Sequence, residues 1–430
     1  MTRFNESRRR LLQGLGASST VLMVPGVAQA SKASKPPRGR VVIIGAGFAG
    51  ATAAKYLRKW SNKGVDVTLI ERNAEFISCP TSNEYLGGNR EYKTMVHSYD
   101  GLRKNWGVKL VNANVTSVDT QKKVVRTDTG GNFTYDRLIV APGVDFMFDK
   151  IEGLDAEAQK TILHAWKAGP QTIALRQQLE AMPDGGTYII TIPKAPYRCP
   201  PGPYERACQV AWYFKQNKPK SRVLVLDANE SIVSKGKLFQ DAWKTEYPGM
   251  IEYRPNWNVT AVDAKTKTVT SELGDTAKGD VVNIVPPMRA GDIAQQMGLV
   301  NVNGLWAGVD WVTMESTAVP NVHVLGDAVF AAPQMPKSGH MANQHGKAVA
   351  AALIEIFSGR KPAPTTMANT CYSMVNNKLG VHVASVHRYN AEKQAPLIVE
   401  GSGGVSKGPS VEEGRYAHGW AVQIWADTLS

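Results

Sequence analysis

The sequence is poor in cysteine. Its 430 residues contain four, Cys79, Cys199, Cys208 and Cys371, and no two of them form a Cys-x-x-Cys pair. That pair is typical of structural zinc sites, so we predict no metal site. The Cys-x-x-Cys-His motif of c-type haem attachment is also absent, so any haem must be carried by another chain.

Long apolar runs and dense basic runs are missing as well. No apolar run reaches the roughly 18 residues that a membrane-spanning helix needs, so we predict no transmembrane segment. The net charge is +13, but no clustered Lys/Arg run or zinc-finger spacing indicates nucleic-acid binding. The positive excess predicts a basic solvated surface or, alternatively, steering of anionic small molecules or of an acidic partner.

The N-terminus has the features of an export signal. Twin arginines at Arg8 and Arg9 precede a mildly apolar stretch over 15–27, and a small-x-small pattern ends at Ala30. This combination predicts a twin-arginine signal peptide over 1–30 that is cleaved near Ala30. We therefore expect the mature protein in the periplasm, with any cofactor loaded before export.

A dinucleotide-binding motif follows. A short apolar strand over 40–44 runs into Gly45, Gly47 and Gly50, in a Gly-x-Gly-x-x-Gly turn that opens a helix. Glu71 ends the next predicted strand, about 20 residues later, where a partner of the ribose 2′-hydroxyl belongs. The glycines let the backbone approach a pyrophosphate, and the helix N-terminus favours its negative charge.

Two later segments favour FAD over NAD. The segment 135–143 is a predicted strand with a tight turn at Gly143, and 322–328 is a strand followed by Gly326 and Asp327. Both resemble signatures of the FAD-dependent pyridine nucleotide-disulfide reductase superfamily. The resemblance implies that Asp327 holds the ribityl chain of the flavin.

A predicted helix that opens at 336–339 and runs through 350 adds a further candidate. Its N-terminus would stabilise negative charge on a reduced flavin. We assign Lys337 to the flavin site, the alternative being a solvated loop lysine.

A second βαβ-like unit begins near residue 170, with a helix over 173–182 and strands over 187–192 and 223–226. From about 360, strands at 370–376, 380–387 and 398–401 indicate a small sheet. We predict an α/β fold with two Rossmann-like domains of the FAD/NAD type and a small C-terminal α+β domain. The predicted parts are a linker at 31–38, a discontinuous FAD-binding domain at 39–150 and 295–358, a second Rossmann-like domain with a redox cysteine at 151–294, and a C-terminal interface domain at 359–430.

Three cysteine segments, 76–84, 197–206 and 370–373, carry a closer resemblance. The second contains the run Cys-Pro-Pro-Gly-Pro-Tyr-Glu-Arg. Together they resemble the flavoprotein subunit of flavocytochrome c sulfide dehydrogenase. The resemblance implies that Cys199 and Cys371 form a redox-active disulfide over the flavin. It also implies that Cys79 carries the FAD covalently through its 8α-methyl group, and that a c-type cytochrome subunit accepts the electrons in a heterodimer.

The chemistry of the residues agrees with that function. A disulfide beside a flavin is an electrophile for a soft anion such as hydrosulfide, and exchange proceeds through a mixed sulfur intermediate. Any of the cysteines is alternatively an inert buried thiol. We assign Cys208 to the core, and a Cys199–Cys208 pairing remains an alternative.

The second Rossmann-like unit lacks a glycine-rich turn. The strand that ends at Ile192 runs into 193–199, which contains prolines and no glycine. A pyrophosphate therefore lacks both room and backbone donors, and we predict that no NAD binds.

Two alternative functions remain. One is a sulfide:quinone oxidoreductase at the membrane surface, which requires an amphipathic C-terminal anchor. The stretch 416–425 is aromatic but short and lacks Lys and Arg, so we interpret it as a packing or partner surface. The other is an electron-carrying flavoprotein without its own substrate. The segment that carries Cys199 argues against this alternative, because a redox-active disulfide there would react with a substrate.

Overall fold

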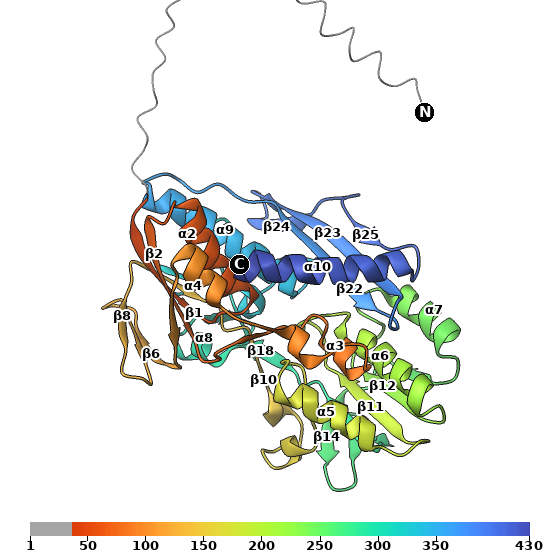
Figure 1. Cartoon of the computed structure of the whole chain (residues 1–430). Coiled ribbons are helices and arrows are strands. Elements are labelled where there is room, and N and C mark those ends of the chain that lie inside the picture. Colours follow the sequence, from red (N-terminus) through yellow and green to blue (C-terminus); the bar gives the residue numbers. More distant parts are fainter. Residues whose placement is uncertain (1–36) are drawn as a thin grey trace, which may run out of the picture. The chain divides into compact units, whose positions relative to one another are not determined.

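The computed structural model describes residues 37–430. The predicted signal peptide at 1–30, and the linker at 31–38 except for its last two residues, lie outside the described residues. In Figure 1 the described chain runs from red at its N-terminal end to blue at its C-terminal end.

A parallel sheet of five strands contains the first βαβ unit. Its strand order is β21-β9-β1-β2-β5, and every neighbouring pair is parallel. Strand β1 carries the run Val41–Ile44, which is buried throughout because helices and loops cover both faces of such a sheet. Because β21 pairs with β9, the sheet joins segments that are far apart in the sequence. Its strands are β1 (Gly39–Ile44), β2 (Val65–Glu71), β5 (Lys109–Asn112), β9 (Arg137–Val140) and β21 (Val322–Val324).

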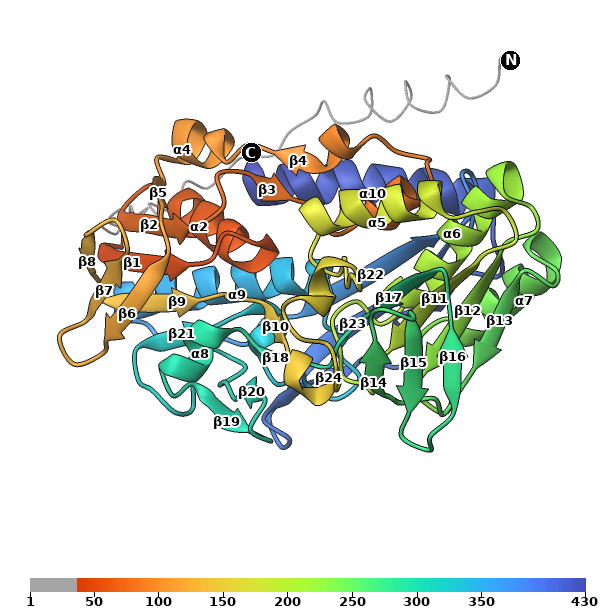
Figure 2. The same ribbon diagram turned by 90° about the horizontal axis from the view of Figure 1, so that it is seen from below.

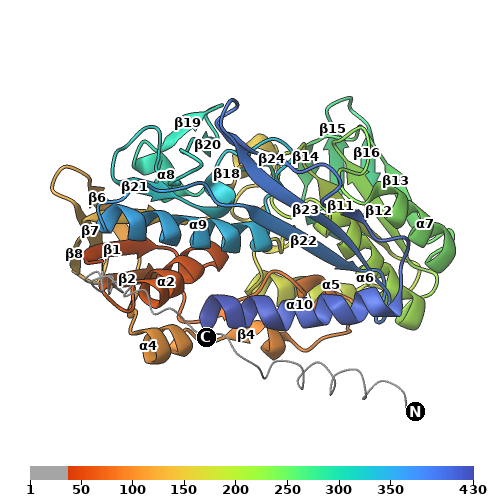
Figure 3. The ribbon, with the colours of Figure 1, turned by 90° about the horizontal axis from the view of Figure 1, so that it is seen from above.

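Two helices cover this sheet and contact each other closely. They are α2 (Phe48–Trp60) and α9 (Gly339–Phe357) (Figure 3). A Cβ atom at Gly346 of α9 would lie only 2.6 Å from the carbonyl oxygen of Ala49 in α2, so the crossing needs a glycine. Between β2 and β9 the chain also forms β3 (Phe76–Ile77), α3 (Ser82–Leu86), β4 (Val96–His97), α4 (Asp100–Trp106), β6 (Val115–Asp119), β7 (Val124–Thr127) and β8 (Asn132–Thr134).

A second parallel sheet has the order β13-β12-β11-β17 (Figure 2). Strand β11 (Thr187–Ile192) is buried at all six positions, as expected for the central strand of a covered parallel sheet. The chain leaves β11 for the loop 193–201, which carries Cys199 and is called the cysteine loop below, and then enters α6 (Gly202–Asn217). The other elements of this region are α5 (Pro170–Ala181), β12 (Arg222–Asp227), α7 (Gly236–Glu246), β13 (Ile251–Arg254), β14 (Val259–Asp263), β15 (Thr268–Ser271), β16 (Thr276–Lys278) and β17 (Val281–Ile284). The strands β10 (Val144–Phe146) and β18 (Met288–Ala290) pair with each other, and α8 (Asp292–Gln296), β19 (Val300–Val302) and β20 (Trp306–Ala307) lie beside β21 (Figure 2).

The C-terminal part is an antiparallel sheet with one long helix. It contains β22 (Met367–Met374), β23 (Gly380–Asn390), β24 (Ala395–Ile398), β25 (Gly404–Val405) and α10 (Val411–Leu429). The predicted strand at 398–401 is wrong: β24 ends at Ile398, because a turn over 391–394 directs the chain straight back along β23.

The stretch 416–425 is not a short segment but the middle of the 19-residue helix α10. One face of α10 packs inward, and Trp425 donates to the Ser78 hydroxyl at 2.9 Å. Near its end, Asp427 accepts a hydrogen bond of 2.5 Å from the Tyr56 hydroxyl and one of 2.8 Å from Lys347. Among residues 37–430, no helix is both long and apolar enough to cross a membrane.

Candidate functional site

The glycine-rich turn joins β1 to α2 in the conformation that the motif predicts. Gly45 has a left-handed φ of +94°, and a Cβ atom at Gly50 would overlap the carbonyl oxygen of Gly45. A Cβ atom at Gly47 would meet nothing within 4 Å, so open space lies beside the N-terminus of α2. The Glu71 carboxylate accepts the backbone N–H of Ala46 at 2.8 Å and so ties the turn to the end of β2. These features fit the pyrophosphate and ribose of a dinucleotide.

The other predicted flavin residues lie at the same edge of the sheet. Gly143 follows β9, and Gly326 and Asp327 follow β21 in a short 3-10 turn (Gly326–Ala328). Because β1, β9 and β21 are parallel neighbours, their carboxyl ends place these loops together. Gly143 and Gly326 have φ values of +67° and +69°.

Lys337 is buried, with 5% of its surface exposed, so the solvated-loop alternative is wrong. Its ammonium donates to the carbonyl oxygens of Asp327 at 2.8 Å and Val329 at 2.5 Å. It also lies 3.7 Å from the centre of the Trp306 ring. Burial lowers the pKa of Lys337 to about 8. Lys337 therefore holds the shape of the Asp327 turn.

A small cavity beside this turn contains a polar atom without a partner. Gly326, Asp327, Lys337, Met341 and His345 are among its lining residues. His345 Nδ1 accepts the Gly326 N–H at 3.2 Å, so the neutral ring carries its proton on Nε2. That buried Nε2 has no hydrogen-bond partner in the described part of the chain. The unpaired His345 Nε2–H could donate to a polar group of a bound ligand at this edge, and FAD has such groups.

Helix α9 begins at Gly339, three residues after the predicted start. Ser338 caps it by accepting the Met341 N–H at 3.0 Å. A Cβ atom at Gly339 would lie 3.1 Å from the ring of Phe48, the first residue of α2. The N-termini of α2 and α9 therefore meet at the same edge, and both favour negative charge there.

Cys79 lies in the loop between β3 and α3, next to the loops that carry Ala168 and Arg198. Its Sγ accepts the backbone N–H of Ala168 at 3.4 Å and an Arg198 Nη2 hydrogen at 3.5 Å. Arg198 also donates to the carbonyl oxygen of Trp166. Burial opposes the charge on Arg198, yet the nearby Cys79, Asp327 and Cys199 raise its pKa overall. Arg198, which the sequence did not identify, thus lies among three predicted site residues.

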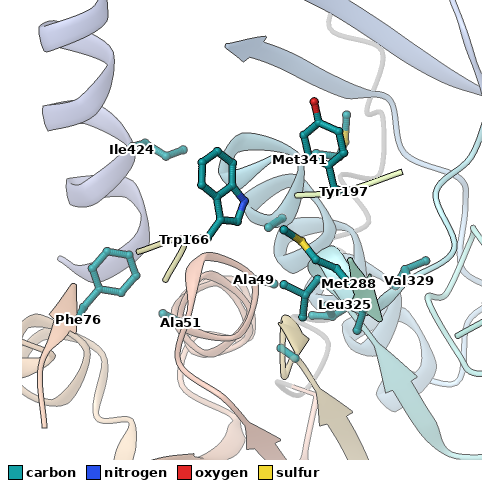
Figure 4. Packing of buried hydrophobic residues seen from close by; sticks show 14 of the residues in the cluster. Ala49, Ala51, Phe76, Trp166, Tyr197, Met288, Leu325, Val329, Met341 and Ile424 are labelled. Atoms are coloured by element: carbon teal, nitrogen blue, oxygen red, sulfur yellow. The ribbon is translucent and has the colours of Figure 1, made fainter. Parts of the chain in front are cut away.

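Buried apolar side chains surround these loops (Figure 4). In this view Trp166 lies between Ile424 of α10 and Met288, above Ala49 of α2. The Trp166 indole donates to the carbonyl oxygen of Arg198 at 3.0 Å. The packing holds the Arg198 loop in place.

The structure brings Cys199 and Cys371 together from distant segments. Cys199 precedes α6 and Cys371 lies in β22, and the two elements are joined because Gln209 of α6 donates to the Met374 carbonyl oxygen at 3.0 Å. Burial, and after it the charge of Cys371, raises the pKa of Cys199 well above its usual range. All four cysteines are free thiols in the structure, so the Cys199–Cys371 disulfide stays a prediction.

Cys208 belongs to the core, as expected. Its side chain is fully buried in α6, and its Sγ accepts the indole N–H of Trp243 at 3.2 Å. Burial raises the pKa of Cys208 to about 12. A protonated, packed thiol of this kind is chemically inert.

Two ionisable residues next to the cysteine pair were not identified from sequence. Glu205 accepts the Met374 backbone N–H at 2.7 Å and the Asn83 side-chain amide at 2.8 Å, and burial raises its pKa. Lys235 donates to the Cys371 carbonyl oxygen at 2.9 Å. Glu205 lies in the run that follows Cys199 and could have been noted there. Lys235 lies in a loop before α7 and has no sequence signal.

In the second parallel sheet, the carboxylate at the end of β12 already accepts as many hydrogen bonds as it can. Asp227 is completely buried, and its Oδ2 accepts the hydroxyls of Tyr204 at 2.6 Å and Tyr253 at 3.0 Å. Its Oδ1 accepts the backbone and side-chain N–H groups of Asn229. A carboxylate has about four acceptor sites, so Asp227 has none left for a ribose.

Comparison with known proteins supports this arrangement. The family model "Sulfide dehydrogenase [flavocytochrome c] flavoprotein chain, central" matches residues 172–286. The flavin-binding model of flavocytochrome c sulphide dehydrogenase matches 363–429, and that of pyridine nucleotide-disulphide oxidoreductase matches 39–177.

Individual relatives are more distant. The chain is 23% identical over 306 residues to the mitochondrial sulfide:quinone oxidoreductase of Mus musculus, covering 67% of this chain and 65% of that protein. It is 24% identical over 369 residues to the corresponding protein of Dictyostelium discoideum, covering 83% of this chain and 75% of that one.

Among solved structures, the sulfide:quinone oxidoreductase from Aquifex aeolicus superposes with a TM-score of 0.72 at 18% identity, over 90% of this chain and 91% of that one. This likeness shows the shared α/β fold with parallel sheets. The two family models specific to flavocytochrome c sulfide dehydrogenase match the second parallel sheet and the C-terminal part, which supply Cys199 and Cys371. The chain is therefore a member of the family of flavoprotein subunits of flavocytochrome c sulfide dehydrogenase.

Proposed function

We propose that this chain oxidises hydrosulfide with FAD and the Cys199–Cys371 pair, and passes the electrons to a c-type cytochrome subunit. The observation that carries this proposal is the position of the cysteine loop. The Cys199 N–H donates to the Lys337 carbonyl oxygen at 2.8 Å, so the loop is attached to the residue that holds the Asp327 turn. Cys199 thus lies beside the edge at which the flavin residues gather.

The reaction begins when a hydrosulfide sulfur bonds to one cysteine sulfur and the disulfide bond breaks. One cysteine becomes a persulfide, and the other leaves with the bonding electron pair as a thiolate. FAD, when bound, accepts two electrons from this thiol chemistry. Burial raises the pKa of both cysteines, and the charge of Glu205 adds to this rise.

FAD would be held by the residues at the sheet edge. The turn at Gly45, Gly47 and Gly50 would take the pyrophosphate, Glu71 the ribose, and Asp327 the ribityl chain. Gly143 and Gly326 leave their loops free of side chains, and Lys337 supports the Asp327 turn.

We further assign covalent attachment of the flavin to Cys79. In support, Cys79 is partly exposed and its sulfur receives hydrogen bonds from the Ala168 N–H and from Arg198. A covalent cofactor also suits a periplasmic protein, which is where the predicted signal peptide would direct this chain.

Nicotinamide does not serve as donor or acceptor in this proposal. The Asp227 carboxylate is already saturated by Tyr204, Tyr253 and Asn229, and the loop after β11 is the proline-rich cysteine loop. In this proposal the electrons leave to a protein partner. No haem-attachment motif is present in the sequence, so the haem belongs to that partner.

Purification from the native host tests the acceptor. A haem absorbance band that co-elutes with the flavin is the expected result. The similarity to sulfide:quinone oxidoreductases supplies the competing outcome. Recovery only from detergent-solubilised membranes, with quinone reduction and no haem, would replace the cytochrome by a quinone.

A further inference from the structure

Lys235 is a buried cation next to the cysteine pair. Only 6% of its surface is exposed, and it lies immediately before α7 in a left-handed conformation with φ of 58°. Its Nζ donates to the carbonyl oxygen of Cys371 at 2.9 Å and to the hydroxyl of Ser373 at 2.7 Å. Both acceptors belong to β22, so the ammonium lies against the strand that carries Cys371.

The charge of Lys235 is not neutralised by a close carboxylate. Within residues 37–430, no Asp or Glu oxygen lies in salt-bridge distance of its Nζ, and two acceptors account for only two of its three N–H donors. Burial lowers the pKa of Lys235, and the ionisable groups that face it oppose this shift; they are Cys371, Glu205, Cys199 and Glu413. The Phe239 ring lies 5.8 Å from its Nζ but carries no opposite charge. Burying a charge without an opposite charge beside it is costly, and the cost falls if an anion forms nearby during the reaction.

The charge of Lys235 affects the pKa of Cys371 more than that of Cys199. Burial raises the pKa of Cys371, and Lys235 is the main charge that opposes this rise. For Cys199, burial, Cys371 and Glu205 raise the pKa, and Lys235 opposes them less than Arg198 does. Arg198 is itself directed to Cys79 and to the Trp166 carbonyl oxygen.

We propose that Lys235 is a positioning residue that makes Cys371 the leaving thiolate, which directs the substrate sulfur to Cys199. This inference rests on the proposed function. The hydrosulfide sulfur bonds to Cys199 Sγ, the Cys199–Cys371 bond breaks, and its electron pair leaves on Cys371 Sγ. The substrate proton stays on the terminal persulfide sulfur. A sulfur with a lower pKa is the better leaving group in such an exchange, so the cation next to Cys371 sets the direction of attack.

The order of alkylation in the wild-type protein tests this directly and without sulfide. The full holoprotein is reduced anaerobically with dithiothreitol, given a limiting pulse of iodoacetamide at pH 7, and digested for mass spectrometry. We expect Cys371 to be labelled before Cys199, because the thiolate is the form that reacts. Labelling of Cys199 first would overturn the proposal.

The variants Lys235→Met and Lys235→Arg test the role of the charge. In Lys235→Met the pH profile of Cys371 alkylation should move up by about one unit, which makes labelling near neutral pH roughly tenfold slower. Lys235→Arg should retain the wild-type profile. The matched control is Lys237→Met, because the Lys237 side chain is 85% exposed and pairs with Asp241 on the surface.

An unchanged profile in Lys235→Met with an intact flavin spectrum would contradict the proposal. If Lys235→Met does not load FAD, the labelling order in the wild-type protein still decides the question. Failure of sulfide to bleach the wild-type flavin would instead refute the proposed function, since alkylation involves no sulfide.

Discussion

The backbone N–H of Cys199 donates to the carbonyl oxygen of Lys337 at 2.8 Å. This hydrogen bond joins the loop between β11 and α6 to the segment before α9. Cys199 adopts a left-handed φ of 60°, which few residues other than glycine do, so the loop is held in an uncommon conformation. This one hydrogen bond thus connects the cysteine loop to the sheet edge at which the predicted flavin-binding residues lie.

Replacing Cys79 should separate flavin attachment from flavin binding. In wild-type protein, flavin colour should remain with the pellet after acid precipitation. In Cys79→Ser the colour should move to the supernatant, while the purified native variant still contains FAD held by the glycine-rich turn. Flavin in the supernatant of the wild-type protein, or in the pellet of the variant, would show that attachment is not at Cys79.

Gly50 should be essential for FAD loading. In Gly50→Ala the new Cβ atom would overlap the Gly45 carbonyl oxygen, so the turn must open and the pyrophosphate site is lost. We expect the purified variant to have less than about a tenth of the wild-type flavin absorbance per protein. Gly408→Ala, at a glycine with no atom within 4 Å of the added Cβ, is the control and should load normally. Normal loading of Gly50→Ala would show that this turn does not bind the cofactor.

NADH and NADPH should not reduce the flavin. The reason is that Asp227 has no free acceptor and that prolines replace the glycine-rich turn in the second parallel sheet. Anaerobic mixing with excess NADH should leave the flavin absorbance unchanged. Rapid bleaching would reveal a nicotinamide site that this arrangement does not provide.

Lys337 should make the free energy of unfolding of the protein increase with pH in the alkaline range. Burial lowers its pKa to about 8, below the usual value of a lysine, so between pH 8 and pH 10 the unfolded chain binds more protons than the folded chain. The free energy of unfolding of the wild type should therefore rise relative to that of Lys337→Met, by on the order of 2 kcal/mol over this interval. Denaturant unfolding of both proteins at the two pH values measures it. A constant difference would mean that Lys337 does not titrate there.

The sequence predicted the elements whose signals are local. The Gly45–Gly50 turn, the buried strand at Thr187–Ile192 and the core position of Cys208 all follow from motif or periodicity. In contrast, Lys235 is brought to Cys371 only because the loop before α7 folds against β22, and Arg198 reaches Cys79 across three loops. Such contacts depend on the tertiary arrangement and leave no pattern in the sequence.

The helix α10 is an intermediate case. Ser410 caps it by accepting the Glu413 N–H, and the buried positions Ala417, Ala421, Ile424 and Thr428 recur at helical spacing. Aromatic residues within the stretch 416–425 fall on both exposed and buried positions, which obscures this period in the sequence. Its buried face shows that much of α10 packs against the protein's own core.

The most direct test of the account is anaerobic mixing of the purified protein with sulfide while the flavin absorbance is recorded. The wild type and Cys208→Ser should bleach, whereas Cys199→Ser and Cys371→Ser should bind FAD normally and fail to bleach. The Cys208 thiol is packed against Trp243 and should therefore be dispensable. Bleaching of Cys371→Ser together with its loss in Cys208→Ser would contradict the account, because the reactive pair would then be Cys199 and Cys208.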